Sequence, residues 1–241
     1  MTLIISEVSR HGIAMAADSA VTFSGRAYLG QDKIQQIPEK QAGLAVWGLG
    51  HIGKIDKDKK RDDWIYTDIW LHNFIKNDVK STMSLWQVAE RLASKMNDAF
   101  GDILSDDDDR MGVHVCGFDD YEGGRGPAVY HVNNGNFHYE ISEGEFLPAG
   151  DEPMREFRAD RAIPPKAWPV DGRDVGVERH GDIFVFGWLE CCLTYFSDQI
   201  QRQTLFKFPF PNDLDRRGEY LRLLISLASG KTVNHLSFRL G

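Results

Sequence analysis

The sequence predicts an α+β fold in the form of a four-layer α-β-β-α sandwich. Apolar and β-branched runs typical of strands open the chain, return in its middle and close it. Two regions with apolar residues at helical spacing separate these groups of strands. Each amphipathic helix needs a sheet to cover its apolar face, so we expect two central sheets with helices outside. The sequence contains no internal repeat that would predict a different architecture.

The first 50 residues are predicted to form two pairs of strands. Residues 3–8 and 12–18 are apolar runs joined by a tight turn. Residues 33–37 and 43–48 form a second pair, divided by a turn that begins at Pro38. We therefore expect an opening hairpin followed by a second hairpin.

The period then changes to that of a helix. Residues 63–76 carry apolar side chains at helical spacing. Ser84 begins a second helix, because Gln87 three residues later can complete a capping box. One apolar stripe follows, made by Leu85, Val88, Leu92, Met96 and Ala99.

The second half repeats this order with one irregular stretch. Strands are predicted at 112–118, 127–132 and 137–141. Residues 143–181 show no sustained period and predict a long connection or an insertion. Four more elements are predicted after it: a strand at 182–187, a helix at 189–200, a helix at 214–228 and a strand at 233–240. Asn212 and Gly230 are the expected caps of the second of these helices. The whole chain, 1–241, is predicted to be a single domain.

Composition argues against several functional classes. The chain has 241 residues with 28 basic and 36 acidic side chains, a net charge of −8, so nucleic-acid binding through a basic surface is not expected. No apolar run approaches the roughly 20 residues of a membrane helix, and no signal-peptide pattern opens the chain. Three cysteines do not make a disulfide framework, so a cytoplasmic location is expected.

The candidate chemistry begins at Thr2. Removal of Met1 would expose an α-amine on the same residue that carries a hydroxyl. A threonine hydroxyl alone is a weak nucleophile. A free α-amine, with an ordinary pKa of about 7.7–8.0, can act as its base near neutral pH. Nucleophile and base would then lie on one residue, a known variant of the catalytic triad.

Three further residues stand where predicted strands end or begin. Asp18 closes the second strand, Lys33 opens the third and Gly48 closes the fourth. A tight turn in the first hairpin would bring the strand ends at residues 2 and 18 together. A lysine held there by Asp18 would lower the pKa of the Thr2 hydroxyl and disfavour protonation of the amine. A glycine at 48 allows a substrate to approach the backbone, whose N–H can bind an oxyanion.

These segments resemble the proteasome β-subunit family of N-terminal nucleophile (Ntn) hydrolases. The resemblance is carried by Thr2, by Gly-Ile-Ala-Met-Ala-Ala-Asp-Ser at 12–19, by Lys33 and by Ala-Val-Trp-Gly-Leu-Gly at 45–50. It continues in Val-Cys-Gly-Phe-Asp-Asp at 115–120 and Gly-Pro-Ala-Val-Tyr-His-Val at 126–132. The interval of 16 residues from Thr2 to Asp18 matches that family. The family's fold is the same four-layer sandwich.

The resemblance implies a role for each catalytic candidate. Thr2 would be the nucleophile, Lys33 the group that tunes it, Asp18 the partner of Lys33 and Gly48 the oxyanion donor. It also implies three substrate-binding positions: the backbone of Thr22 and Gly50 for pairing with an extended peptide, and Val46 for the first specificity pocket.

The implied function is that of a threonine-type peptidase or amidase. It would cleave amide bonds through a covalent acyl-enzyme on Thr2, with a peptide or another amide as substrate. The resemblance implies no metal and no organic cofactor, because the amine and the lysine supply the proton chemistry. Members of the family stack into rings, so it also implies a homo-oligomer, and an unfoldase partner stays open.

Three features depart from the family pattern. Lys33 lies one residue closer to Thr2, and Trp47, which can narrow the cleft, replaces the small residue before Gly48. The family's Gly-Ser-Gly-like turn has its candidates at residues 149–151 and 186–188, and neither contains serine. The alternative function is therefore a catalytically inactive proteasome-like subunit with a scaffold role in a ring.

Other chemistries have less support in the sequence. Cys191 and Cys192 lie on a predicted apolar helix face, which is typical of packing rather than of a cysteine nucleophile. His114, His131 and His138 lack a compact metal-ligand spacing. The acidic run at 106–109 lacks the ligand pattern of a calcium loop. We therefore expect no metal site.

Overall fold

The computed structural model of the chain describes residues 4–9, 12–23, 26–48, 50–52, 65–101, 111–134, 139–142, 145–148, 156–163, 165, 176–180, 213–229 and 233–238. This part of the chain contains both strands and helices, so the α+β class is confirmed. The predictions that fall outside the described residues concern Thr2, the acidic run 106–109, the strand 182–187, the helix 189–200 and the caps Asn212 and Gly230.

Within the described residues, the first sheet has four antiparallel strands. In spatial order they are β14 (Gly176–His180), β1 (Ile4–Ser9), β2 (Gly12–Asp18) and β15 (Val233–Phe238). The predicted opening hairpin is confirmed, with Ile4 of β1 opposite Ala17 of β2. On its other side β2 pairs with β15, which places Val233 opposite Asp18. Segments from the two ends of the chain are therefore neighbours in this sheet.

In the part of the chain that the structure describes, the second sheet has five antiparallel strands. In spatial order they are β13 (Arg158–Ile163), β10 (Gly124–Asn133), β9 (Gly112–Tyr121), β6 (Ala42–Trp47) and β5 (Ile34–Ile37). The predicted second pair of strands is confirmed as β5 and β6, joined through a 3-10 helix at Pro38–Lys40. Strand β5 is one edge of this sheet.

The described ranges also contain three short hairpins outside these two sheets. They are β3 (Ala20–Phe23) with β4 (Arg26–Leu29), β7 (His51–Ile52) with β8 (Ile65–Tyr66), and β11 (Tyr139–Ser142) with β12 (Glu145–Pro148). The first of these directly follows β2 and was not predicted from the sequence.

The two sheets pack face to face across one apolar cluster. Side chains alternate between the two faces of a strand, so every second residue of the inner strands reaches this core. The first sheet contributes Ile4, Val8, Ile13, Met15 and Ala17, and the second contributes Ile34, Ala45, Trp47, Cys116, Phe118 and Val129. Cys116 is fully buried there, as expected of a packing cysteine.

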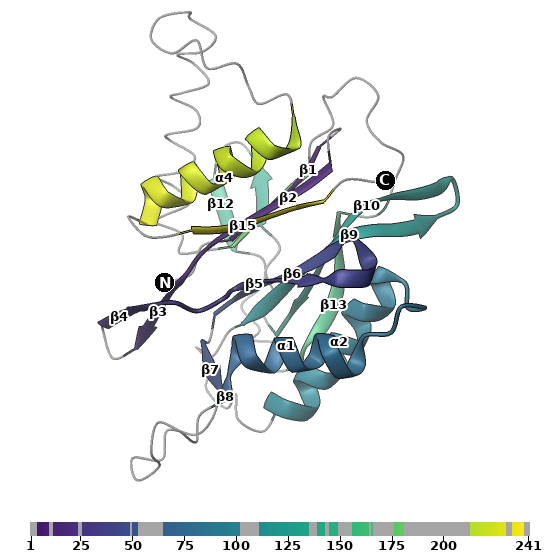
Figure 1. The fold of residues 1–241 in the computed structure, drawn as a ribbon, viewed down its shortest axis with the longest axis horizontal. Helices are drawn as coiled ribbons and strands as arrows, with labels where there is room; N and C mark the ends of the chain where they lie inside the picture. The colour runs from purple at the N-terminus through teal and green to yellow at the C-terminus, as the bar shows by residue number, and fades with distance from the viewer. Residues whose placement is uncertain are drawn as a thin grey trace, which may run out of the picture.

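Helices cover the outer faces of both sheets (Figure 1). Helix α4 (Leu214–Ser229) lies on β2 and β15 of the first sheet. Helices α1 (Thr67–Asp78) and α2 (Leu85–Phe100) lie on the second sheet. The predicted apolar stripe of α2 faces this sheet: Leu85, Val88, Leu92 and Met96 are buried against it, and Ala99 packs on the same cluster. Helix and sheet thus close a second apolar core.

The start of α2 is fixed by two sets of hydrogen bonds. The predicted capping box is present: the Gln87 N–H donates to Ser84 Oγ over 3.0 Å, and the Ser84 N–H donates to Gln87 Oε1 over 2.9 Å. The carboxylate of Asp119 on β9 accepts from the N–H groups of Leu85 and Trp86. A negative charge at a helix N-terminus is favourable, so Asp119 ties α2 to the second sheet.

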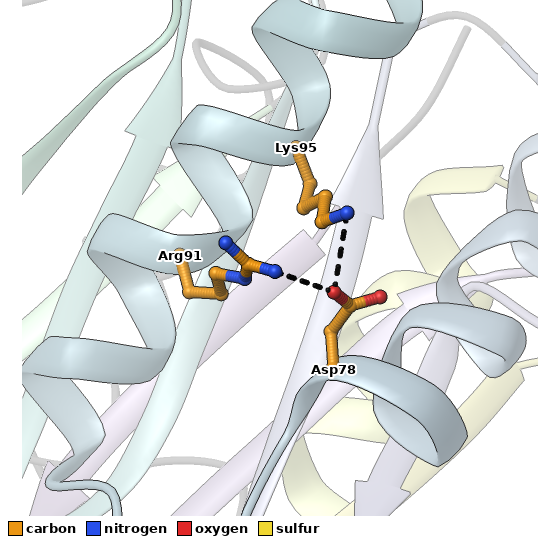
Figure 2. Close-up of polar contacts among 3 residues, drawn as sticks. All are labelled: Asp78, Arg91 and Lys95. Atoms are coloured by element: carbon orange, nitrogen blue, oxygen red, sulfur yellow. Dashed lines mark hydrogen bonds and ion pairs between the residues drawn. The ribbon is translucent and has the colours of Figure 1, made fainter.

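Helices α1 and α2 are also joined at the surface. Asp78 is the last residue of α1, and its Oδ1 forms ion pairs with Arg91 Nη2 at 3.0 Å and Lys95 Nζ at 3.3 Å (Figure 2). Arg91 and Lys95 lie one turn apart on α2. These side chains are partly exposed, so water screens their attraction.

One predicted irregular stretch contains strands. Residues 143–181 include β12, β13 and β14, so the prediction of an irregular connection is wrong for those residues. Among the described strands, β13 and β14 are edges of the second and first sheets, respectively. Their sequences, Arg-Ala-Asp-Arg-Ala-Ile and Gly-Val-Glu-Arg-His, are rich in charge, as edge strands often are. They therefore lack the apolar run by which strands were recognised.

Candidate active site

A buried ion pair joins the two sheets. Asp18 is the last residue of β2, and Lys33 stands directly before β5. Lys33 Nζ lies 3.1 Å from Asp18 Oδ1, and each side chain is only 3% exposed. Taking two charges out of water is costly, and their mutual attraction offsets that cost only at close range. The short contact is therefore what allows both charges to be buried at this end of the fold.

The backbone around Lys33 is held from two sides. The Lys33 carbonyl accepts the N–H of Val46 over 2.9 Å, which ties it to β6. The N–H groups of Gly30 and Gln31 both donate to the Ser19 carbonyl over 3.3 Å. Since Ser19 follows Asp18, these bonds hold the segment before Lys33 beside the end of β2. The ammonium group thus has a fixed position.

The segment after β6 turns at Gly48. This residue has a φ of 91°, in the left-handed region that favours glycine. Two residues later the Gly50 carbonyl accepts from Gln31 Nε2 over 2.8 Å and from the Thr67 N–H over 3.2 Å. Gln31 is buried, and neither it nor Thr67 was among the sequence candidates. Together they connect the turn after β6 to the segment before Lys33 and to the start of α1.

Three predicted residues remain: Val46, Thr22 and Thr2. Val46 is 3% exposed and packs in the core between the second sheet and the helices. Thr22 lies on β3 with its backbone paired to Ala27 of β4. Thr2 lies outside the described residues. Of the four catalytic candidates, the structure brings Asp18 and Lys33 into contact.

Trp47 fills the core rather than open space. Its side chain is 9% exposed and belongs to the cluster between the sheets. Its Nε1 donates to His131 Nε2 over 3.0 Å. Opposite it in the ladder stands Gly112, where an added Cβ would come within 2.7 Å of the indole. The large ring in a position expected to be small is therefore accommodated by a glycine on the neighbouring strand.

Two of the histidines considered as metal ligands lie closer together in the fold than their separation in the sequence indicated. His114 on β9 stands directly opposite His131 on β10, with ring centroids 5.2 Å apart. Both are buried, and His138 lies outside the described residues. Within the described ranges, no group of three or more His, Cys, Asp or Glu side chains is arranged to hold a metal ion.

A groove runs along β5, an edge of the second sheet among the described strands. It has a volume of about 800 Å³ and lies between β5 and α1, with Asp32 and Ile34 at the end next to Lys33. Gln35 on its floor donates from Nε2 to the Asp68 carbonyl over 2.5 Å. The Asp32 N–H lies 3.4 Å from Asp68 Oδ2. The start of α1 is thus anchored beside the ion pair.

Comparisons with known proteins give the fold but no family. No family model matches the sequence, and no curated protein matches it. Among solved structures, Anbu (ancestral beta-subunit) from Yersinia bercovieri is similar over 99% of this chain and 81% of its own, with a TM-score of 0.51 and 13% sequence identity. At that identity the likeness concerns the fold alone, which is that of a proteasome-like subunit. No helix in the described part of the chain has the length and apolarity to cross a membrane.

Proposed function

We propose that this protein is a threonine-type Ntn hydrolase, a peptidase or amidase with Thr2 as its nucleophile. The observation that carries the proposal is the buried contact between Lys33 and Asp18. Ile4 begins β1 opposite Ala17, the neighbour of Asp18. Thr2 precedes Ile4 by two residues, so the two Cα atoms are within about 7 Å of each other. This length of chain is short enough for the proposed nucleophile to lie beside the ion pair.

The proposed reaction uses groups of this chain only. The hydroxyl oxygen of Thr2 attacks the amide carbon while its proton passes to the α-amine of the same residue. The ammonium of Lys33, held by Asp18, stabilises the developing alkoxide, and the Gly48 N–H binds the oxyanion. The C–N bond then breaks as the leaving amine takes the proton. Water hydrolyses the resulting ester on Thr2 and releases the acid.

Substrate binding and assembly belong to the same proposal. An extended peptide would pair with the backbone of Thr22 and Gly50, with Val46 at the base of its first side-chain pocket. The chain would form one four-layer domain that self-associates into rings in the cytoplasm. The overall likeness to the ancestral beta-subunit supports this at the level of the fold.

An inactive ring subunit is the second candidate. The observation that favours it is the lack of serine at residues 149–151 and 186–188, the two candidate positions for the family's serine turn. A scaffold subunit, however, has little use for a buried lysine that must be neutralised by a carboxylate. The hydrolase is therefore the function that the described geometry supports best.

Reaction with a threonine-directed electrophile, such as a peptide epoxyketone, tests the proposal. Intact mass first establishes that Met1 has been removed. The wild type should then gain one adduct, Thr2→Ala none, and Lys33→Ala an adduct at a rate reduced at least about a hundredfold. Lys95→Ala, which removes an exposed lysine on α2, is the matched control and should react as the wild type does. An adduct that persists in Thr2→Ala would place the nucleophile elsewhere, and an unreactive mature wild type would favour the scaffold.

A further inference from the structure

A cluster of polar side chains lies inside the apolar core between the two sheets. It consists of Ser6 on β1, Trp47 on β6, His114 on β9, and His131 and Asn133 on β10, and we call it the inter-sheet polar cluster. None of its members is more than 9% exposed. Buried polar groups are costly unless they are hydrogen-bonded, so such a cluster is retained for a reason.

The hydrogen bonds of the cluster determine which ring nitrogen of His131 carries the proton. An indole N–H can only donate, so His131 Nε2 accepts from Trp47 and the neutral imidazole carries its proton on Nδ1. The side-chain nitrogen of Asn133, Nδ2, lies 3.2 Å from that Nδ1. Two N–H donors cannot bond to each other, so Asn133 accepts this proton only with its amide nitrogen and oxygen exchanged. The tautomer of His131 is therefore set by the indole bond.

A second histidine connects His131 to the first sheet. His114 meets the His131 ring edge-on, with centroids 5.2 Å apart and planes at 87°. Its Nδ1 lies 2.9 Å from Ser6 Oγ, across the gap between the sheets. The position of His131 is thus set by its own strand, by the neighbouring strand and by the opposite sheet. A side chain fixed on three sides is a rigid hydrogen-bond acceptor.

Trp47 is the residue that this acceptor fixes. Its indole is packed at Gly112 on one side and bonded to His131 at Nε1, so its ring has little freedom to rotate. Trp47 shares a peptide bond with Gly48, the residue at which the chain leaves β6 with a φ of 91°. A fixed indole anchors the Cα of Trp47, from which that peptide, with the N–H of Gly48, extends.

We propose that His131 is a positioning residue, which aims the Gly48 N–H through the indole of Trp47. This rests on the proposed function, in which that N–H binds the oxyanion. Oxyanion donors act by being held in place before the reaction, and a displacement of about 1 Å lowers a rate by about a hundredfold. Glycine alone would leave the turn free to move. The hydrogen bond from the buried indole to the rigid imidazole restricts this movement of the turn.

The kinetic test compares variants that keep or remove the acceptor. His131→Leu should lower the maximal rate of adduct formation with a peptide epoxyketone by about tenfold to a hundredfold, while the half-saturating concentration of the epoxyketone stays unchanged. His131→Gln, which can accept the same hydrogen bond, should restore most of that rate. Trp47→Phe, which keeps an aromatic ring but lacks the donor, should resemble His131→Leu. Trp86→Phe on α2 is the matched control and should react as the wild type does.

A spectroscopic test reads the same geometry without any activity. Trp47-Gly48 is the only Trp-Gly step in the sequence, so labelling tryptophan carbonyls with ¹³C and glycine nitrogens with ¹⁵N gives one correlated amide signal, that of Gly48. This signal should move or broaden in His131→Leu, and in Gly112→Ala, where a Cβ displaces the indole. It should stay near its wild-type position in His131→Gln.

The two tests separate the possible failures. A mature wild type that forms no adduct would overturn the proposed function, while the Gly48 signal still decides whether His131 positions that amide. The inference is wrong if the Gly48 signal is the same in His131→Leu as in the wild type. It is also wrong if His131→Leu and His131→Gln are slowed equally, because loss of packing alone would then explain the effect.

Discussion

Two groups of charges in this molecule have nearly the same geometry and very different surroundings. In the buried pair, Lys33 Nζ lies 3.1 Å from Asp18, with both side chains 3% exposed. In the surface group, Asp78 lies 3.0 Å from Arg91 and 3.3 Å from Lys95, with exposures from 21% to 45% (Figure 2). Distance alone therefore does not distinguish them.

The difference teaches what each group is for. Exposed pairs contribute about 0–1 kcal/mol, since water screens them and long side chains lose freedom. A buried pair loses its hydration, and an apolar replacement of both partners is often as stable or more so. The surface group therefore adjusts stability slightly, whereas the buried pair lowers stability and is, in the proposed function, the pair that supports the chemistry of Thr2.

Removal of one buried partner should have the largest effect. Asp18→Ala leaves the Lys33 ammonium enclosed without its carboxylate, so the free energy of unfolding should fall by about 3–5 kcal/mol. Urea denaturation followed by circular dichroism measures the change. A loss below about 1 kcal/mol would show that water reaches Lys33, and the contrast with the surface group would then disappear.

Removal of both partners sharpens the comparison. Asp18→Leu combined with Lys33→Met replaces the charges by apolar side chains of similar size, so stability should equal or exceed that of the wild type by up to about 4 kcal/mol. The same protein should form no adduct with the epoxyketone. A double variant as unstable as Asp18→Ala would mean that the pair itself stabilises the fold.

The buried side chain of Tyr130 should make the stability of the protein depend on pH. Burial and the 2.6 Å hydrogen bond to Asp119 raise the pKa of Tyr130 above its ordinary value of 10.0. Above pH 10 the unfolded chain loses this proton while the folded chain keeps it, so stability falls by up to about 1.4 kcal/mol per pH unit. Thermal unfolding between pH 9 and 11 should show a shallower decline for Tyr130→Phe. Equal slopes would show that Tyr130 does not titrate differently on folding.

The surface group should give the smallest effect. Asp78→Ala should lower the free energy of unfolding by no more than about 1 kcal/mol, and 0.5 M salt should reduce that difference further. Urea unfolding at low and high salt measures both values. A loss as large as that of Asp18→Ala would mean that Asp78 holds α1 and α2 together far more strongly than an exposed carboxylate can.

Local patterns allowed much of this fold to be predicted from the sequence. The capping box of Ser84 and Gln87 is a contact between residues three apart, so it needs no knowledge of the rest of the molecule. The opening hairpin is predicted by its apolar runs and tight turn. Edge strands such as β13 could not be predicted, because one open side lets them carry charges in place of an apolar run.

The site was predictable where the sequence places residues at strand ends. Asp18 and Lys33 could be paired in advance because each stands where a strand ends or begins, although 15 residues separate them. The hydrogen bond from Trp47 to His131 spans 84 residues and depends on which strands become neighbours. Its one signal in the sequence is Gly112, the first residue of an apolar strand, and the meaning of this glycine becomes clear only with the strand register.

A crystal structure of the mature protein after reaction with a peptide epoxyketone tests the central claim most directly. The account predicts a covalent adduct on both the hydroxyl oxygen and the α-nitrogen of Thr2, with Lys33 Nζ within about 4–6 Å of that oxygen. It also predicts that Lys33 still contacts Asp18. An adduct on another residue, or a Thr2 far from Lys33 with its hydroxyl in solvent, would contradict the account.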